Sequence, residues 1–173
     1  MQNEQAVFAS LDEADFVAVL GSIYEHSPWV AELVWQQKTQ HPSSYLDGKE
    51  KLQAAMRDVV DQSSDEQKLI LLRAHPDLAG KAALAGSLTD ASKSEQAGAG
   101  LDQCSDEELV HFLQLNDEYR GKFGFPFIMA VKGATKEQIL KGFEERMPND
   151  WQTEFDRALN EVHKIAGFRL AEL

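Results

Sequence analysis

The sequence lacks the features that mark secreted and membrane proteins. Its 173 residues contain a single cysteine, Cys104, so no disulfide can form within the chain, as is usual in a reducing compartment. No apolar run approaches the length of about 18 residues that a membrane-spanning helix needs, and the first residues lack the pattern of a signal peptide. We therefore expect a cytoplasmic protein.

Positive charge is also scarce. Lysine and arginine together number 17, against 29 aspartate and glutamate residues, which gives a formal net charge of −12. A charge of this sign repels nucleic-acid phosphates and anionic lipids. We expect neither nucleic acid nor a membrane surface as a partner.

Motifs for metals and cofactors are missing as well. The five histidines never fall within four residues of one another, and neither Cys-x-x-Cys nor His-Glu-x-x-His occurs. The sequence has no glycine-rich loop of the Walker or dinucleotide-binding type. It therefore predicts no metal site and no nucleotide cofactor. Cys104 has no cationic neighbour in sequence, which favours a bystander thiol over a nucleophile.

Helix start and stop signals, by contrast, recur along the chain. Three capping boxes open apolar stretches with helical spacing, and we also predict helices over residues 12–24, 28–38, 48–60 and from 150 onward, with a loop over 41–44. The boxes are Ser64-x-x-Gln67, Ser105-x-x-Glu108 and Thr135-x-x-Gln138.

The apolar stripes of the helices over 12–24, 28–38 and 48–60 should bury Phe16 and Val19, Val34, and Leu52 in turn, and Ser27 should cap the second. The four consecutive apolar residues 69–72 predict a helix that is buried on most sides. Strand patterns between tight turns are lacking. The sequence predicts one all-α domain over residues 1–173, a compact bundle of about seven to nine helices.

Two segments do not fit helix packing. Residues 96–100, QAGAG, are glycine-rich, and each glycine inside a helix costs about 0.5–1 kcal/mol relative to alanine. Residues 121–133, GKFGFPFIMAVKG, are mostly apolar, begin and end with glycine, and are interrupted by Pro126. We expect both to be non-helical places where backbone approaches another group.

His75 stands where a helix should stop. Pro76 disfavours helical geometry at the residue before it, so the helix that Ser64 opens should end near Ala74. A histidine there can serve as a general acid or base, since it titrates near neutrality, or it can cap the last carbonyl groups. Spacing alone favours the cap.

Glu95 and Arg169 also leave two interpretations open. Ser92-x-x-Glu95 matches a capping box, but Glu95 could instead share a proton with His75. Arg169 lies near the end of the last predicted helix, where a solvated arginine suits the helix dipole. Its functional alternative is bidentate capture of a carboxylate or a urea-like group.

Four motifs follow one another in a specific order. They are LLRAHPDLAGKAA, SKSEQAGAGLD, NDEYRGKFGFPFIMAVKG and EVHKIAGFRL. With them the chain resembles, over nearly its whole length, the 2-oxo-4-hydroxy-4-carboxy-5-ureidoimidazoline (OHCU) decarboxylases, which complete the three-step route from urate to (S)-allantoin in purine catabolism. The resemblance implies an all-α carboxy-lyase without a cofactor, commonly a homodimer.

The same resemblance implies roles for individual residues. His75 and Glu95 are the catalytic pair that it implies. The substrate-binding residues that it implies are Pro76, Ser92, Lys93, Ser94, Glu95, Gln96, Phe127, Ile128, Met129, Ala130, Val131 and Arg169.

Two other classes of protein compete with this interpretation. One is a helical interaction module that uses FGFPFIM as an exposed docking patch. The other is a ureide hydrolase with a metal-activated water, for which the histidine spacing offers no site. A concave segment that faces His75 and Glu95 would favour an enzyme, and a convex patch far from His75 would favour the docking surface.

Overall fold

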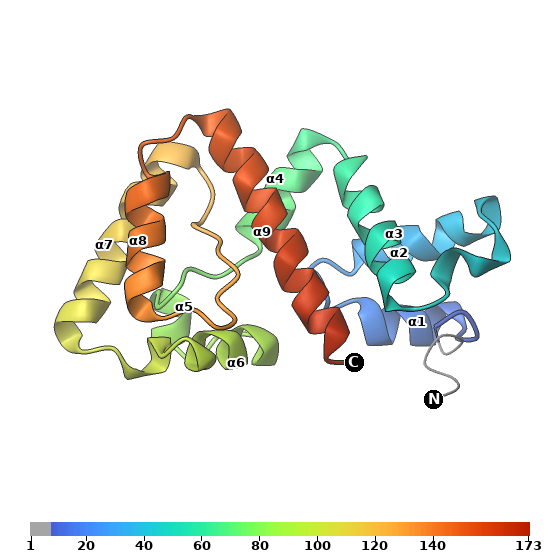
Figure 1. Cartoon of the computed structure of the whole chain (residues 1–173), viewed down its shortest axis with the longest axis horizontal. Coiled ribbons are helices and arrows are strands. Elements are labelled where there is room, and N and C mark those ends of the chain that lie inside the picture. Colours follow the sequence, from blue (N-terminus) through green and yellow to red (C-terminus); the bar gives the residue numbers. More distant parts are fainter. Residues whose placement is uncertain (1–7) are drawn as a thin grey trace. The chain divides into compact units, whose positions relative to one another are not determined.

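The computed structural model describes residues 8–173, whose regular structure is entirely helical (Figure 1). The α-helices are α1 (Glu13–Leu20), α2 (Trp29–Gln37), α3 (Lys49–Asp61), α4 (Asp65–Arg73), α5 (Lys81–Leu84), α6 (Asp90–Gly98), α7 (Asp106–Phe123), α8 (Lys136–Arg146) and α9 (Trp151–Ala171). Three short 3-10 helices, η1 (Lys38–Gln40), η2 (Ser43–Leu46) and η3 (Leu101–Gln103), lie between them. The predicted all-α class is confirmed. No helix within this range is long and apolar enough to cross a membrane.

Contacts divide the chain into two compact units. The first comprises the described residues up to Ala74 together with Ile165–Leu173, and the second comprises His75–Lys164. In the first unit α1 packs on α2, and α2 packs on α3. Phe16, Val34 and Leu52 lie in its core, fully buried. All three occupy the apolar stripes that the sequence predicts, so local periodicity accounts for this packing.

The second unit is built around aromatic rings from α7, α8 and the connection between them. Phe127 stacks on Phe143 with ring centroids 3.8 Å apart, and Tyr119 meets Phe127 edge-on at 5.3 Å. All three side chains are fully buried. Offset and edge-on pairs add about 0.5–1.5 kcal/mol each beyond the area that they bury. The connection after α7 is therefore anchored in the core.

The predicted helix starts are largely confirmed. Ser105 and Thr135 form complete capping boxes at α7 and α8. The Ser64 side chain accepts the Gln67 N–H at the start of α4, and Asp150 accepts the Thr153 N–H at the start of α9. These side chains satisfy backbone donors that have no partner inside the helix.

Several local predictions are wrong. The first helix stops at Leu20, where the Gly21 N–H closes onto the Val17 carbonyl. Val19 is 39% exposed instead of buried. The expected loop at 41–44 is partly helical, since η2 begins at Ser43. The exact end of a helix and the exposure of a residue on its apolar stripe depend on how neighbouring elements pack against the helix. The spacing of apolar residues alone does not define that packing.

Two further predictions concern the ends and faces of helices. Ser27 does not cap α2, because its hydroxyl donates to the Glu25 carbonyl instead. The run of four apolar residues in α4, which predicts a helix buried on most sides, is buried only in part: Leu71 and Leu72 are fully buried, but Ile70 is 57% exposed.

The glycine-rich segments are more helical than predicted. α6 continues to Gly98 and stops at Gly100, which has a left-handed φ of 79°. α7 continues through Phe123 and stops at Gly124, again with a φ of 79°. Residues 124–134 are irregular, as predicted. Glycine therefore ends both helices, because it adopts positive φ at little cost.

Candidate active site

His75 follows directly after the end of α4, as the sequence predicts. The helix ends at Arg73, and the Ala74 N–H bonds to the Ile70 and Leu71 carbonyls. The imidazole residue is 6% exposed. It opens a turn-rich segment, residues 75–80, that we call the HPDLAG loop.

The HPDLAG loop is tight. Ala79 has a φ of 51°, which is uncommon for a residue with a Cβ and costs about 1 kcal/mol or more. A Cβ added at Gly80 would lie 2.5 Å from the Cβ of Asp77. Only glycine fits that position, so the sequence Ala-Gly commits the backbone to this turn.

Gln96 of α6 holds the loop through both atoms of its amide. Its Oε1 accepts the Ala79 N–H at 3.0 Å, and its Nε2 donates to the Asp77 carbonyl at 3.2 Å. The side chain is buried. Buried backbone groups of a strained turn are thus satisfied by one side chain, which attaches the loop to α6.

Two residues of α7 hold the same loop. Asn116 is buried and donates from Nδ2 to the Leu78 carbonyl at 2.8 Å. Arg120 Nε lies 2.9 Å from Asp77 Oδ1 in a half-exposed ion pair. The loop that begins with His75 is therefore fixed between α6 and α7.

α6 carries the predicted site residues 92–96. Ser92 and Gln96 are buried and Glu95 is half-buried, whereas Lys93 and Ser94 are exposed. Ser92 does not cap this helix. Thr89 caps it, with its side chain accepting the Ser92 N–H. The capping-box interpretation of Ser92-x-x-Glu95 is therefore wrong, and Glu95 lies within the helix.

Residues 127–131 form the wall between α7 and α8. Phe127, Ile128 and Val131 are buried, while Met129 and Ala130 are half-buried. Phe123 and Phe125 are buried too. The interpretation of this segment as an exposed docking patch is therefore wrong, because its aromatic rings form core contacts.

One turn of α7 connects the two segments. Asn116 and Arg120 contact the HPDLAG loop, and Tyr119 packs on Phe127. The structure therefore fixes His75, Gln96 and the 127–131 segment to a common set of helices in the second unit.

Arg169 belongs to the first unit. It is 8% exposed, and its Nη2 lies 2.7 Å from Oε2 of the buried Glu25. Its Nη1 also donates to the Ser22 carbonyl at 3.4 Å. The interpretation of Arg169 as a solvated helix-end arginine is wrong, since a buried carboxylate balances its charge.

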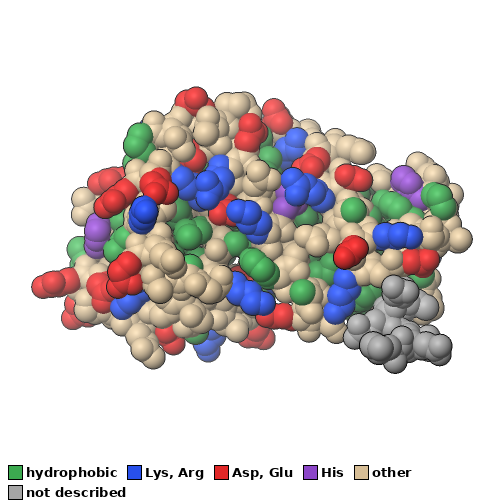
Figure 2. All heavy atoms as spheres, in the orientation of Figure 1, with side chains coloured by type: hydrophobic (Ala, Val, Ile, Leu, Met, Phe, Trp, Pro, Cys, Tyr) green, Lys and Arg blue, Asp and Glu red, His purple; other side chains and the backbone are tan. Residues whose placement is uncertain are grey.

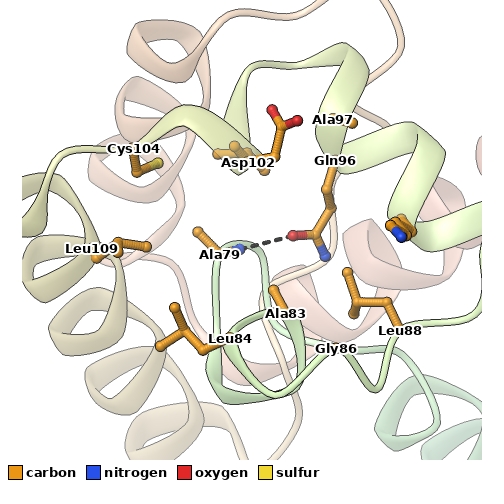
Figure 3. A pocket seen from close by; sticks show the side chains of 12 residues that line it. Ala79, Ala83, Leu84, Gly86, Leu88, Gln96, Ala97, Asp102, Cys104 and Leu109 are labelled. Atoms are coloured by element: carbon orange, nitrogen blue, oxygen red, sulfur yellow. Dashed lines mark hydrogen bonds between the residues drawn. The ribbon is translucent and has the colours of Figure 1, made fainter.

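A cavity of about 250 Å³ lies beside the HPDLAG loop (Figure 3). Gln96 and Ala79, joined by their hydrogen bond, both line it, and Leu84, Ala97 and Cys104 surround them. Neither His75 nor Glu95 is part of its wall as the described residues define it. The described part of its wall does include Lys93 and Gln96, two residues of the predicted substrate-binding set.

The thiol of Cys104, which lines this cavity, has a raised pKa. Burial and the carboxylate of Glu108 raise the pKa of its thiol, against a smaller lowering by Lys136. A raised pKa keeps the sulfur protonated at neutral pH, which agrees with a bystander thiol. In the part of the chain that the structure describes, no three His, Cys, Asp or Glu side chains gather as metal ligands would.

Surface charge is mixed on the face that Figure 2 shows, where carboxylate and cationic side chains are interspersed. Such a surface offers no broad basic stripe there for a phosphate backbone.

The structural roles of Asn116 and Arg120 are the part of the site that motif reasoning missed. Asn116 carries a usable signal, because it interrupts an apolar stripe of α7 formed by Phe112, Tyr119 and Phe123. A polar residue on a buried stripe needs a hydrogen-bond partner. Arg120 carries no such signal, since it is half-exposed.

The two hydrogen bonds from Gln96 to the HPDLAG loop predict a loss of stability when this side chain is removed. Gln96→Ala should lower the free energy of unfolding by at least about 2 kcal/mol, because the buried Ala79 N–H and the part-buried Asp77 carbonyl lose their partners. Arg120→Ala is the matched control and should cost at most about 1 kcal/mol, since the ion pair that it removes is half-exposed. Urea denaturation measures both, and equal losses would contradict the assignment.

Comparisons with known proteins agree with the motifs. The OHCU decarboxylase family profile matches residues 9–171. The 2-oxo-4-hydroxy-4-carboxy-5-ureidoimidazoline decarboxylase of Haloferax volcanii is 46% identical over 162 residues, covering 94% of this chain and 90% of that protein.

Solved structures show the same likeness. A crystal structure of (S)-allantoin synthase aligns with a TM-score of 0.76 and 37% identity, covering 96% of this chain and 52% of that one. A crystal structure of OHCU decarboxylase in the presence of (S)-allantoin aligns with a TM-score of 0.66 and 25% identity, covering 94% and 97%. The chain belongs to the OHCU decarboxylase family.

Proposed function

We propose that this protein decarboxylates 2-oxo-4-hydroxy-4-carboxy-5-ureidoimidazoline and releases (S)-allantoin, the last step of urate degradation to allantoin. Family membership over nearly the whole chain supports this reaction. The observation that carries it in the structure is the buried His75, which opens a loop that side chains of α6 and α7 hold in place. A titratable ring in a fixed position is what proton transfer requires.

The substrate provides its own electron sink. One ring carbon bears a carboxylate and a hydroxyl group, and the adjacent carbon is part of an imine. When the carbon–carboxylate bond breaks, CO2 leaves, and the electron pair moves toward the imine nitrogen, which takes up a proton. The product of this step is an enol. We therefore propose a reaction without a metal or organic cofactor.

The enol then becomes a ketone by two proton transfers. The hydroxyl oxygen loses its proton, and the former imine carbon gains one on a single face. We assign proton transfer at the hydroxyl group to His75, as general base or acid. Glu95, half-buried on α6, orients His75 or holds the ureido group. Protonation of one face alone gives one enantiomer.

The remaining residues bind and orient the substrate. Pro76, Ser92, Lys93, Ser94 and Gln96 form the part of the site next to His75 and Glu95. Phe127, Ile128, Met129, Ala130 and Val131 supply backbone groups and an apolar face for the flat ring. Arg169 binds a carboxylate or a urea-like group through its planar guanidinium.

Replacement of the proposed acid/base gives the main test. His75→Ala should lower the decarboxylation rate at least about a hundredfold, because the variant has no group to move the hydroxyl proton. His111→Ala, which removes an exposed histidine on α7, is the control and should keep the wild-type rate. The assay generates the substrate freshly from urate and follows the optical activity of the allantoin. A near-normal rate in His75→Ala overturns the assignment, and racemic product at the uncatalysed rate from the wild type overturns the reaction.

Arg169 offers a test of substrate binding. Arg169→Lys keeps a positive charge beside Glu25 but removes the fork of donors, so the KM should rise about tenfold while kcat changes little. Arg157→Lys, on an exposed part of the same helix, should leave KM unchanged. Steady-state kinetics on both variants decides, and a fall in kcat alone would assign Arg169 to the transition state instead.

We also propose that the protein acts as a homodimer, as the family resemblance implies. The chain length supports a single domain, and the single cysteine supports a location in the cytoplasm. Light scattering on the purified chain should give twice the mass of one 19.3 kDa chain. A monomer mass at micromolar concentration would contradict the dimer.

A further inference from the structure

Arg146, at the end of α8, is buried and paired with a buried carboxylate. The Arg146 side chain is 4% exposed, and the Glu154 side chain is fully buried. Arg146 Nε lies 2.8 Å from Glu154 Oε1. Glu154 accepts two further hydrogen bonds, from the Tyr119 hydroxyl at 2.6 Å and from Asn149 Nδ2 at 3.1 Å. The pair is therefore balanced in charge, and the orientation of the guanidinium is fixed.

The same guanidinium reaches the 127–131 segment. Arg146 Nη1 donates to the Ile128 carbonyl at 2.5 Å. Its central carbon lies 4.3 Å from the centre of the Phe127 ring. One buried side chain thus contacts two consecutive residues of the segment that the proposed function assigns to substrate binding.

Fixing the Ile128 carbonyl also fixes the Met129 N–H. The two groups belong to one planar peptide unit, and no cis peptide bond occurs among the described residues. In a trans peptide the C=O and N–H bonds point in opposite directions. Since the Ile128 carbonyl points at Arg146, the Met129 N–H points away from the buried cluster of Arg146, Glu154 and Tyr119.

The backbone donors of this segment have no acceptor among the residues that the structure describes. Within residues 8–173, none of the N–H groups of residues 127–131 donates a hydrogen bond. Met129 is half-buried, so part of this residue is accessible to a ligand. Backbone donors near the protein interior are nearly always satisfied, and a bound ligand is one way to satisfy them.

We propose that Arg146 is a positioning residue of the decarboxylase, which aims and polarises the Met129 N–H as a hydrogen-bond donor to the substrate. The hydrogen bond from a cation to the carbonyl of a peptide strengthens the N–H of that peptide as a donor. This inference rests on the proposed function, because it assigns the donor to the substrate of that reaction.

A merely structural role for Arg146 has a different kinetic signature. Loss of stability lowers the fraction of folded enzyme and therefore Vmax, but the KM of the folded molecules stays the same. A positioning role changes the KM itself, because each folded molecule then binds the substrate more weakly.

Arg146→Lys and Tyr119→Phe separate the two roles. The lysine keeps the positive charge but has one nitrogen, which cannot serve Glu154 and the Ile128 carbonyl in the geometry of the arginine fork. Tyr119→Phe removes two hydrogen bonds of the same buried cluster, the one that the hydroxyl donates to Glu154 and the long one, 3.4 Å, that it accepts from Arg146 Nη2. It leaves the bond from Arg146 Nη1 to the Ile128 carbonyl in place. Both variants should lower the melting temperature.

Only Arg146→Lys should raise the KM, by about five- to tenfold, which is what a lost hydrogen bond is worth. Tyr119→Phe should keep the wild-type KM. An unchanged KM in Arg146→Lys, or an equal rise in both variants, overturns the positioning role. An inactive wild type overturns the proposed function and this inference together.

A measurement on the wild type does not depend on the folding of a variant. Titration of the ¹⁵N-labelled chain with (S)-allantoin, followed by NMR, should move the amide resonance of Met129. The amide of Val110, which is exposed on α7, is the control and should stay in place. A Met129 resonance that does not move while others shift overturns the assignment of this donor.

Discussion

A single turn of α7 is the constraint on which the rest of the second unit depends. Asn116 and Arg120 hold the HPDLAG loop through the Leu78 carbonyl and the Asp77 side chain. Tyr119, between them in sequence, packs on Phe127 and donates to Glu154. Positions three and four residues apart lie on neighbouring parts of a helix surface, so one rigid turn fixes both segments. Displacing this turn would move His75 and the 127–131 segment together.

Hydrogen bonds from buried polar side chains to backbone carbonyls fix the irregular segments. Gln96 serves the HPDLAG loop and Arg146 serves Ile128, each from a buried position. Apolar packing is tolerant of small shifts, whereas a hydrogen bond to a defined carbonyl is not. In the proposed reaction the electron sink lies in the substrate, so the proposed contribution of the protein is orientation and proton transfer, which require such placement.

Much of the fold could be predicted from local patterns. The capping boxes at Ser105 and Thr135 are complete, and His75 lies just past the end of its helix because Pro76 follows. The errors arose where a local rule competed with tertiary contacts. Ser92-x-x-Glu95 has the form of a capping box, but Thr89 begins the helix earlier, and α6 continues into a glycine-rich stretch that propensity disfavours.

The sequence by itself determined where most of the helices begin, which stripes are apolar and to which family the chain belongs. It did so because caps, prolines and periodicity act over a few residues. Only the tertiary structure decided that Gln96 binds the HPDLAG loop, that Arg169 pairs with Glu25, and that Arg146 lies against Phe127 and Ile128. These partners are far apart along the chain, and a buried polar group takes whichever partner the packing brings within hydrogen-bond distance.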